Sequence, residues 1–274
     1  MNILQVIPRL DTGGAERTTI EIAEALVREG HGAFVASEGG RLEDELAATG
    51  ASLVRLPMDS KSPWGLVSNV RALVKLIRSE AIDVVHARSR APAWSALRAA
   101  RATGIPFVTT YHGSYNAASG LKRFYNSVMA RGDRIIANSG FIEAHILAEH
   151  DTDPARITMI PRGVDIERFS GSGEARTRGR DLAIAWGLPD DRIIGVLPAR
   201  LTRWKGQTVA IEALARMKAE GQPLPLLLLV GDDQGRSAYR EELEALIASH
   251  DLTGDVRLMG HQGDMPAVYA LADF

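Results

Sequence analysis

Short runs of β-branched and other apolar residues alternate with longer segments of helical periodicity along most of this chain. This rhythm is typical of βαβ units, in which each strand is followed by a helix and the strands form a parallel sheet. Seven strands are predicted first, at Ile3–Ile7, Ala33–Ser37, Leu53–Leu56, Val84–His86, Phe107–Thr110, Arg134–Ala137 and Ile157–Ile160. Helices are predicted between them at Ala15–Arg28, Leu42–Thr49, Leu66–Ser79, Pro92–Ala102, Leu121–Arg131 and Phe141–Glu149. We therefore expect one complete, doubly wound α/β domain over residues 1–168.

The rhythm is interrupted from Phe169 onward, where the residues are small, polar and charged without apolar periodicity. We interpret residues 169–190 as a linker region. The rhythm then resumes with strands predicted at Ile193–Leu197, Leu224–Val230 and Val256–Met259, and helices at Gln207–Glu220, Ala238–His250 and Met265–Leu271. Three strands form an incomplete Rossmann-like sheet, whose last strand would have an unpaired edge. We therefore expect residues 191–274 to be part of a second Rossmann-like domain.

The composition excludes several classes of function. The 274 residues include 32 Lys and Arg against 34 Asp and Glu, so the net charge of −2 lacks the general basicity of a nonspecific nucleic-acid binder. No cysteine is present, which excludes disulfides and thiolate metal sites and suits a reducing cytoplasm. No apolar run approaches the roughly 20 residues that span a bilayer. We expect a cytoplasmic protein, either soluble or peripheral on the inner face of the cytoplasmic membrane, with no nucleic-acid partner.

Two features of the first domain follow predicted strands. The loop after the first strand contains Gly13 and Gly14, with Glu16 in the helix that begins there, and paired glycines at a helix start let backbone N–H groups approach an anion. A plain turn is the alternative interpretation. The three spaced glycines of a dinucleotide-binding loop are missing, which disfavours an NAD enzyme. His86 and His112 should both reach the edge where open α/β sheets bind ligands, although one such histidine is more often structural.

An acid-free segment separates Asp83 from Asp133, and it contains seven basic residues: Arg88, Arg90, Arg98, Arg101, Lys122, Arg123 and Arg131. Near its end, apolar residues recur at helical spacing, at Leu121, Phe124, Tyr125 and Val128. An amphipathic helix with basic flanks can lie on an anionic membrane or hold a phosphorylated lipid. The alternative is a core-facing helix with a solvated basic face.

Arg200 and Lys205 follow the first strand of the second domain, and a helix begins just after Gly206. An arginine can bind phosphate oxygens bidentately, a lysine adds a point charge, and the helix start adds N–H donors. This combination predicts a site for a departing diphosphate. The glycine and lysine order of a P-loop is missing, which disfavours ATP hydrolysis. Because neither His86 nor His112 has metal-ligand spacing to a second histidine or carboxylate, we predict no metal site.

Taken in order along the chain, these motifs resemble those of the retaining glycosyltransferases of family 4, which have the GT-B fold of two Rossmann-like domains. The resemblance covers essentially the whole chain and is carried by Gly13-Gly14-Ala15-Glu16, Tyr111-His112-Gly113, Ala137-Asn138-Ser139, Ile160-Pro161-Arg162-Gly163-Val164-Asp165, Ala199-Arg200-Leu201 with Lys205-Gly206, Val230-Gly231-Asp232 and Val256-Arg257-Leu258-Met259-Gly260. Two positions depart from the family's pattern, since Arg162 replaces the usual asparagine and Ala199 the usual glycine.

The resemblance implies that the protein moves a sugar, with retention of configuration, from a nucleoside diphosphate sugar to a cell-envelope glycan or a lipid-linked acceptor, as in lipopolysaccharide or polysaccharide biosynthesis. The first domain would bind the acceptor and the second the sugar nucleotide, with no cofactor and no obligatory metal. The implied site residues are His112 as the catalytic residue, Arg200, Lys205 and Gly14 on the donor diphosphate, and Gly13, Glu16, His86 and Arg162 on the acceptor side of the cleft.

The family's pattern continues beyond Phe274 to two glutamates that hold the donor and to a closing C-terminal helix. We therefore expect this chain to be C-terminally truncated, which leaves its own activity open. Two alternative functions remain. A sugar-nucleotide epimerase of the same fold would need acidic and basic residues around the sugar ring. A noncatalytic fragment would bind the acceptor or a partner enzyme through its first domain.

Overall fold

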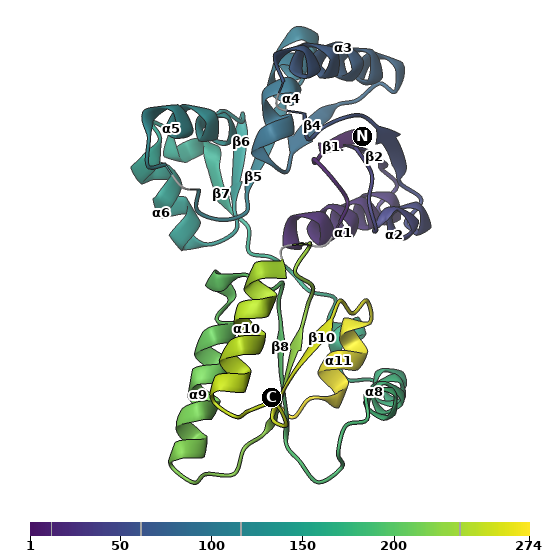
Figure 1. The fold of residues 1–274 in the computed structure, drawn as a ribbon. Helices are drawn as coiled ribbons and strands as arrows, with labels where there is room; N and C mark the ends of the chain where they lie inside the picture. The colour runs from purple at the N-terminus through teal and green to yellow at the C-terminus, as the bar shows by residue number, and fades with distance from the viewer. Residues whose placement is uncertain (12, 61, 116, 236) are drawn as a thin grey trace. The chain divides into compact units, whose positions relative to one another are not determined.

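The computed structural model describes residues 1–11, 13–60, 62–115, 117–235 and 237–274 and divides them into two compact units, Met1–Gly163 and Val164–Phe274 (Figure 1). Each unit is a parallel sheet flanked by helices. The predicted architecture of two α/β domains is confirmed. The division falls five residues earlier than the predicted end of the first domain at residue 168, because residues 164–168 group with the second unit.

The first unit contains a seven-stranded sheet in the order β3-β2-β1-β4-β5-β6-β7. Every strand pair in it is parallel. Its strands are β1 (Asn2–Val6), β2 (Gly32–Ser37), β3 (Ser52–Arg55), β4 (Val84–Ala87), β5 (Phe107–Tyr111), β6 (Arg134–Ala137) and β7 (Ile157–Met159). The strand order turns back between β1 and β4, which is the place where open α/β sheets bind their ligands.

Serine side chains cap some of the helices of this unit. Ser62 accepts a hydrogen bond from the Gly65 N–H ahead of a proline at the first helical position, and Ser139 accepts one from the Ile142 N–H. The helices are α1 (Gly14–Arg28), α2 (Glu43–Ala48), α3 (Pro63–Ser79), α4 (Arg90–Thr103), α5 (Gly120–Asn126) and α6 (Gly140–Glu149), with 3-10 turns η1 (Ser127–Ala130) and η2 (Pro154–Arg156).

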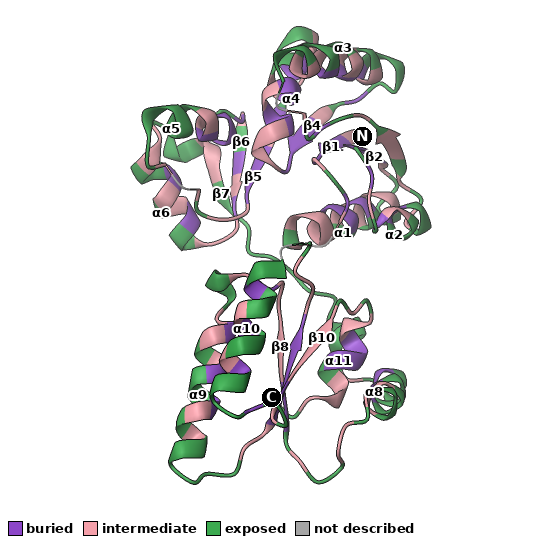
Figure 2. Ribbon diagram, in the orientation of Figure 1, coloured by how far each residue is buried: buried purple, intermediate pink, exposed green. Residues whose placement is uncertain are grey.

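Two apolar clusters form the core of the first unit, and Figure 2 shows the buried residues gathered along the strands. One cluster joins the central strands to α3, α4 and η1, and the other joins β2 and the loop after β1 to α1 and α2. Polar side chains are also buried within the sheet. Gln5 of β1 lies beside His86 of β4 in the strand register, and its amide nitrogen donates to the Thr19 carbonyl of α1 at 2.9 Å. This polar row leads to the candidate site.

The predicted helix over Leu121–Arg131 is divided, and the expected apolar stripe divides with it. After α5 ends, η1 turns inward, where the Met129 carbonyl accepts a hydrogen bond from the Thr109 hydroxyl at 2.6 Å. Val128 is therefore fully buried, whereas Leu121 is 80% and Phe124 57% exposed. The buried and the exposed apolar residues of this segment therefore lie on different turns. None of the described helices is long and apolar enough to cross a membrane.

The second unit contains three parallel strands in the order β10-β9-β8, with β9 buried at the centre. The strands are β8 (Ile194–Pro198), β9 (Leu226–Val230) and β10 (Val256–Gly260), and the helices are α7 (Ile166–Phe169), α8 (Gly173–Ala185), α9 (Gln207–Ala219), α10 (Ser237–Ser249) and α11 (Met265–Leu271), with the 3-10 turn η3 (Arg203–Lys205). As expected, β10 lies at a sheet edge. At the opposite edge, the Val196 N–H donates to the Phe274 carbonyl at 2.9 Å.

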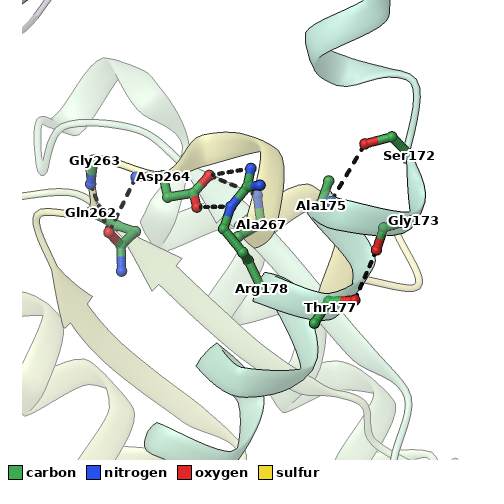
Figure 3. A network of polar contacts seen from close by, with 9 residues as sticks. All are labelled: Ser172, Gly173, Ala175, Thr177, Arg178, Gln262, Gly263, Asp264 and Ala267. Carbon is green, nitrogen blue, oxygen red and sulfur yellow. Dashed lines mark hydrogen bonds and ion pairs between the residues drawn. The ribbon is translucent and has the colours of Figure 1, made fainter.

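The structure differs from the prediction of a linker over residues 169–190, because most of them form α8. This helix packs on α11, where Nε of Arg178 donates to a carboxylate oxygen of Asp264 at 2.6 Å (Figure 3). The other carboxylate oxygen of Asp264 accepts from the Ala267 N–H and caps α11. Gly179 lets the two helices approach, since a Cβ there would lie 3.0 Å from the Ala267 carbonyl oxygen. Polar contacts and a glycine, rather than an apolar stripe, specify α8.

Candidate functional site

The candidate site of the first unit lies at the carboxyl ends of three neighbouring strands, β1, β4 and β5. The loop after β1 leads to Gly14, the first residue of α1. Arg88 follows the last residue of β4, and its backbone N–H donates to the Val6 carbonyl of β1 at 3.0 Å. His112 follows the last residue of β5. Because parallel strands end at the same edge of a sheet, these residues are brought together from distant parts of the sequence.

His86 lies one step inside this edge. Its Nε2 atom is 2.7 Å from the Thr110 hydroxyl, and the side chain is buried. Burial, followed by the charges of Arg88 and His112, holds the pKa of His86 well below its ordinary value. His86 is therefore a neutral group that connects β4 to β5 beneath the site. Its predicted place on the acceptor side of the cleft stays a prediction.

His112 is held at both its backbone and its ring. The Asn138 amide nitrogen donates to the His112 carbonyl at 3.1 Å, and Nη2 of Arg162 lies 3.1 Å from Nδ1 of the ring. A guanidinium group can only donate, so Nδ1 must accept, and the proton of the neutral ring is assigned to Nε2. That Nε2 atom is buried and has no hydrogen-bond partner among the residues that the structure describes.

The charge state of His112 follows from its surroundings. Burial, then the positive charges of Arg88 and Arg162, lowers the pKa of His112 to about 3. At neutral pH the ring is uncharged and presents its Nε2–H as a hydrogen-bond donor. His112 can therefore orient a hydroxyl or phosphate oxygen. The structure agrees with the predicted position of this residue, and its catalytic role stays a prediction.

Gly14 and Arg162 lie against each other. A Cβ atom on Gly14 would collide with Nη1 of Arg162, so glycine at this position leaves room for the guanidinium above the start of α1. A Cβ atom on Gly13, the N-cap residue, would likewise collide with the Glu16 carboxylate, which turns back from the first turn of α1. Gly13, Gly14, Glu16 and Arg162 thus lie together.

Arg88 also belongs to this site, although the sequence analysis named it only as part of the basic segment and not as a site residue. Its side chain is 1% exposed, and its Nε and Nη2 atoms have no hydrogen-bond partner within the described part of the chain. Burial and the charge of Arg162 lower the pKa of Arg88 to about 10, while Glu21 acts in the opposite direction. A signal was present, because Arg88 follows His86 by two residues at a strand end and so shares its face of the sheet.

The second unit holds Arg200 and Lys205 after the carboxyl end of β8. The Gln207 amide, buried at the start of α9, donates to the Arg200 carbonyl at 2.9 Å and fixes this loop. Nη1 of Arg200 donates to the neutral Gln234 amide oxygen at 3.3 Å, and Nζ of Lys205 lies 4.7 Å from the Trp204 ring centre. No carboxylate of the described residues is within ion-pair distance of either cation. Both are available for an anion.

Over residues 1–11, 13–60, 62–115, 117–235 and 237–274, the structure contains no group of three or more His, Cys, Asp or Glu side chains that could hold a metal ion. The expectation that transfer requires no metal stays a prediction.

Comparison with known sequences identifies two family matches. The sequence model of Glycosyltransferase Family 4 matches residues 12–168, and that of Glycosyl transferases group 1 matches residues 181–274. A D-inositol 3-phosphate glycosyltransferase of Salinispora arenicola is 31% identical over 153 residues, which cover 53% of this chain and 34% of that protein. The match thus spans about a third of the length of that curated relative.

Solved structures agree with these matches. A glycosyltransferase from Rickettsia africae is 33% identical and has a TM-score of 0.85, with 99% of this chain and 71% of that chain covered. HepE from Anabaena, solved in complex with UDP and glucose, is 22% identical and has a TM-score of 0.82, with 100% of this chain and 73% of that chain covered. The second likeness concerns the fold alone.

Proposed function

The chain belongs to glycosyltransferase family 4 and has the GT-B fold, and from that premise we propose that it takes part in moving a sugar from a nucleoside diphosphate to an acceptor. The observation that carries the proposal is the pair Arg200 and Lys205, placed between the end of β8 and the start of α9 without a carboxylate partner among the described residues. Two such cations match the charge of a diphosphate.

The chemistry assigns a task to each group. The bond between the anomeric carbon and the diphosphate oxygen breaks, and a bond from the acceptor oxygen to that carbon forms. Arg200 and Lys205 stabilise the negative charge that develops on the departing diphosphate. In a retaining transfer on one face of the sugar, this diphosphate takes the acceptor's proton. His112, neutral and donating from Nε2, orients a hydroxyl or phosphoryl oxygen of the substrate rather than removing a proton.

The donor and the acceptor are proposed in more detail. HepE binds UDP and glucose, which supports a UDP-sugar as the donor of this protein. The curated relative acts on D-inositol 3-phosphate, which supports an acceptor that carries hydroxyl and phosphoryl groups. We propose a cell-envelope glycan or phosphorylated lipid as the acceptor and the first unit as its binding unit.

Peripheral contact with an anionic membrane fits such an acceptor. Leu121 and Phe124 are exposed on α5, and Arg131 lies 5.4 Å from the Phe124 ring centre. Lys122 is exposed between them. Apolar side chains beside basic ones are the features of a helix that lies in a membrane interface. We propose that α5 supplies this contact on the cytoplasmic side.

A nucleotide titration tests the proposed function. The 15N-labelled chain is titrated with UDP, GDP and ADP, and with UMP as the control that lacks the second phosphate. We expect one diphosphate to shift amide signals around Arg200 and Lys205 and to bind about tenfold or more tightly than its monophosphate, since one charge-assisted contact is lost. If none of the three diphosphates binds, or if the shifts lie away from these residues, the proposal is wrong.

A further inference from the structure

Arg88 differs from Arg192 and Arg101 in what surrounds its guanidinium group. Arg192 donates to three backbone carbonyls and to the Asp255 carboxylate at 2.8 to 3.0 Å. Arg101 forms a two-pronged pair with Asp133 at 2.7 and 3.0 Å. Arg88 is more deeply buried than either, yet two of its three guanidinium nitrogens have no partner within the described residues. Buried charges in proteins are ordinarily paired.

The neighbours of Arg88 add positive charge instead of balancing it. The Arg162 guanidinium is near enough to lower the pKa of Arg88, and Glu21 is the one acidic group that opposes this effect. Glu21 is exposed and makes no hydrogen bond to Arg88. His112 offers no hydrogen-bond acceptor to the site, because Arg162 occupies its one acceptor nitrogen. The groups that converge here are therefore donors that lack an anion.

The hydrogen-bond donors without a partner indicate the chemical class of the ligand. They are Nε and Nη2 of Arg88, both buried, and Nε2 of His112, while Arg162 adds a second cation at the exposed side. Two guanidinium groups balance the charge of a phosphate dianion, and its three terminal oxygens can accept more hydrogen bonds than a carboxylate offers in one plane. We propose that Arg88, Arg162 and His112 form a phosphoryl-binding subsite within the first unit.

This subsite goes beyond the proposed transfer, since it needs only groups of Met1–Gly163 and makes no use of Arg200 or Lys205. Arg88 is the buried member of this subsite, and Arg162, which lies against Gly14, is its exposed member. The phosphoryl group belongs to an acceptor or to the donor's diphosphate, and both sources share the same recognition chemistry.

Phosphate binding to the whole chain tests the subsite. Inorganic phosphate is titrated in chloride buffer at constant ionic strength, by calorimetry and by thermal unfolding, with acetate as the carboxylate probe. The variants are Arg88→Met and Arg88→Lys, and the control is Arg98→Met, which removes an equal charge from an exposed position of α4. We expect Arg88→Met to weaken phosphate binding by about tenfold or more, and Arg98→Met to leave it within about twofold.

The two methods separate a ligand site from a structural role. If Arg88 awaits an anion, Arg88→Met is at least as stable as the wild type without phosphate and loses the rise in melting temperature that phosphate produces. If the variant melts lower at every phosphate concentration and its phosphate affinity is unchanged, the proposal is overturned. Arg88→Lys supplies the same comparison with the charge retained, in case the methionine variant does not fold. Equal binding of acetate and phosphate would also overturn the phosphoryl assignment.

UDP distinguishes the two sources of the phosphoryl group. If UDP leaves the affinity for phosphate unchanged, the result supports a phosphoryl group that belongs to the acceptor. Competition between UDP and phosphate that disappears in Arg88→Met supports the donor's diphosphate. Loss of phosphate binding in Arg200→Ala/Lys205→Ala, with binding retained in Arg88→Met, overturns the subsite but leaves the proposed donor site intact.

Discussion

The two units present their basic groups in opposite ways. In the first unit, Arg88 is buried and lacks a partner for two nitrogens among the described residues, and its pKa is lowered to about 10. In the second unit, Lys205 is exposed and lies over the Trp204 ring, and Arg200 rests on the neutral Gln234 amide. A buried cation keeps its position whether or not an anion is bound, whereas an exposed one relaxes onto its neighbours until the anion arrives.

This difference determines how each unit would respond to its ligand. The first cluster is already ordered, so little side-chain entropy is lost when an anion binds, and binding removes the penalty of an unpaired buried charge. At the second cluster, Lys205 must leave the Trp204 ring and become ordered, which costs affinity. Ligand binding should therefore stabilise the first unit more than its contact area alone suggests.

The largest effect concerns the proton affinity of His112 in the first unit. The pKa of His112 is lowered from 6.5 to about 3, firstly by burial and then by Arg88 and Arg162. Between these two values the unfolded chain binds a proton that the folded chain does not, so acidification from pH 6.5 destabilises the first unit. NMR titration of the His112 ring should show no protonation at or above pH 5.

Arg88→Gln provides the control, because it removes the second cause of the shift while the backbone and Arg162 remain. Its His112 pKa should move upward toward the ordinary value, and the acid sensitivity of the first unit should decrease. A wild-type His112 that titrates near pH 6.5 would show that the buried, cation-rich surroundings do not exist in solution.

The next effect concerns the exposed cations of the second unit. Arg200→Ala/Lys205→Ala removes two charge-assisted contacts of about 1.5 kcal/mol each, so nucleoside diphosphate affinity should fall by roughly 100-fold. Calorimetry or NMR titration measures this loss. The matched control is Arg216→Ala/Arg240→Ala, which removes two cations from exposed ion pairs on α9 and α10 and should leave affinity unchanged. Equal losses in both variants would indicate a general charge effect.

The secondary structure could be predicted from the sequence only in part. All ten strands were found at or near their observed positions, because each is a short apolar run bounded by turn residues. α8 was missed since its helix is specified by a Ser172 cap, the Arg178 to Asp264 pair and Gly179, none of which produces an apolar period. α5 was extended too far because apolar spacing cannot show that η1 turns inward.

The residues of the candidate site were also predicted only in part. His112 and Gly14 could be placed from strand ends alone. The contact of Arg162 with His112 spans 50 residues and arises only when β7 and β5 are set in one sheet. Arg88 lies in a run of basic residues that is typical of a solvated face, and only its place two residues after His86 at a strand end indicates that folding buries it.

The smallest expected effect extends the comparison to a membrane surface. Basic residues contribute about 1 kcal/mol each near an anionic bilayer, so Lys122→Gln/Arg123→Gln should weaken binding to phosphatidylglycerol vesicles by about 30-fold at low salt. Glutamine avoids a new repulsion with Glu149, which pairs with Arg123 at 3.4 Å. Co-sedimentation measures the change.

Arg176→Gln/Arg180→Gln on α8 of the second unit removes the same charge from exposed positions and serves as the control. If the wild type ignores anionic vesicles at low salt, or if the two variants lose binding equally, the membrane contact does not lie on α5.

The most direct test of two separate anion sites is a crossed calorimetric titration. UDP and inorganic phosphate are each titrated into the wild type, Arg88→Met, Arg200→Ala/Lys205→Ala and the triple variant. We expect phosphate affinity to fall by about tenfold or more in Arg88→Met and to stay within about twofold in Arg200→Ala/Lys205→Ala, UDP affinity to fall in Arg200→Ala/Lys205→Ala, and both to fall in the triple variant. Loss of phosphate binding in Arg200→Ala/Lys205→Ala, or unchanged phosphate binding in Arg88→Met, would contradict the existence of two separate anion sites.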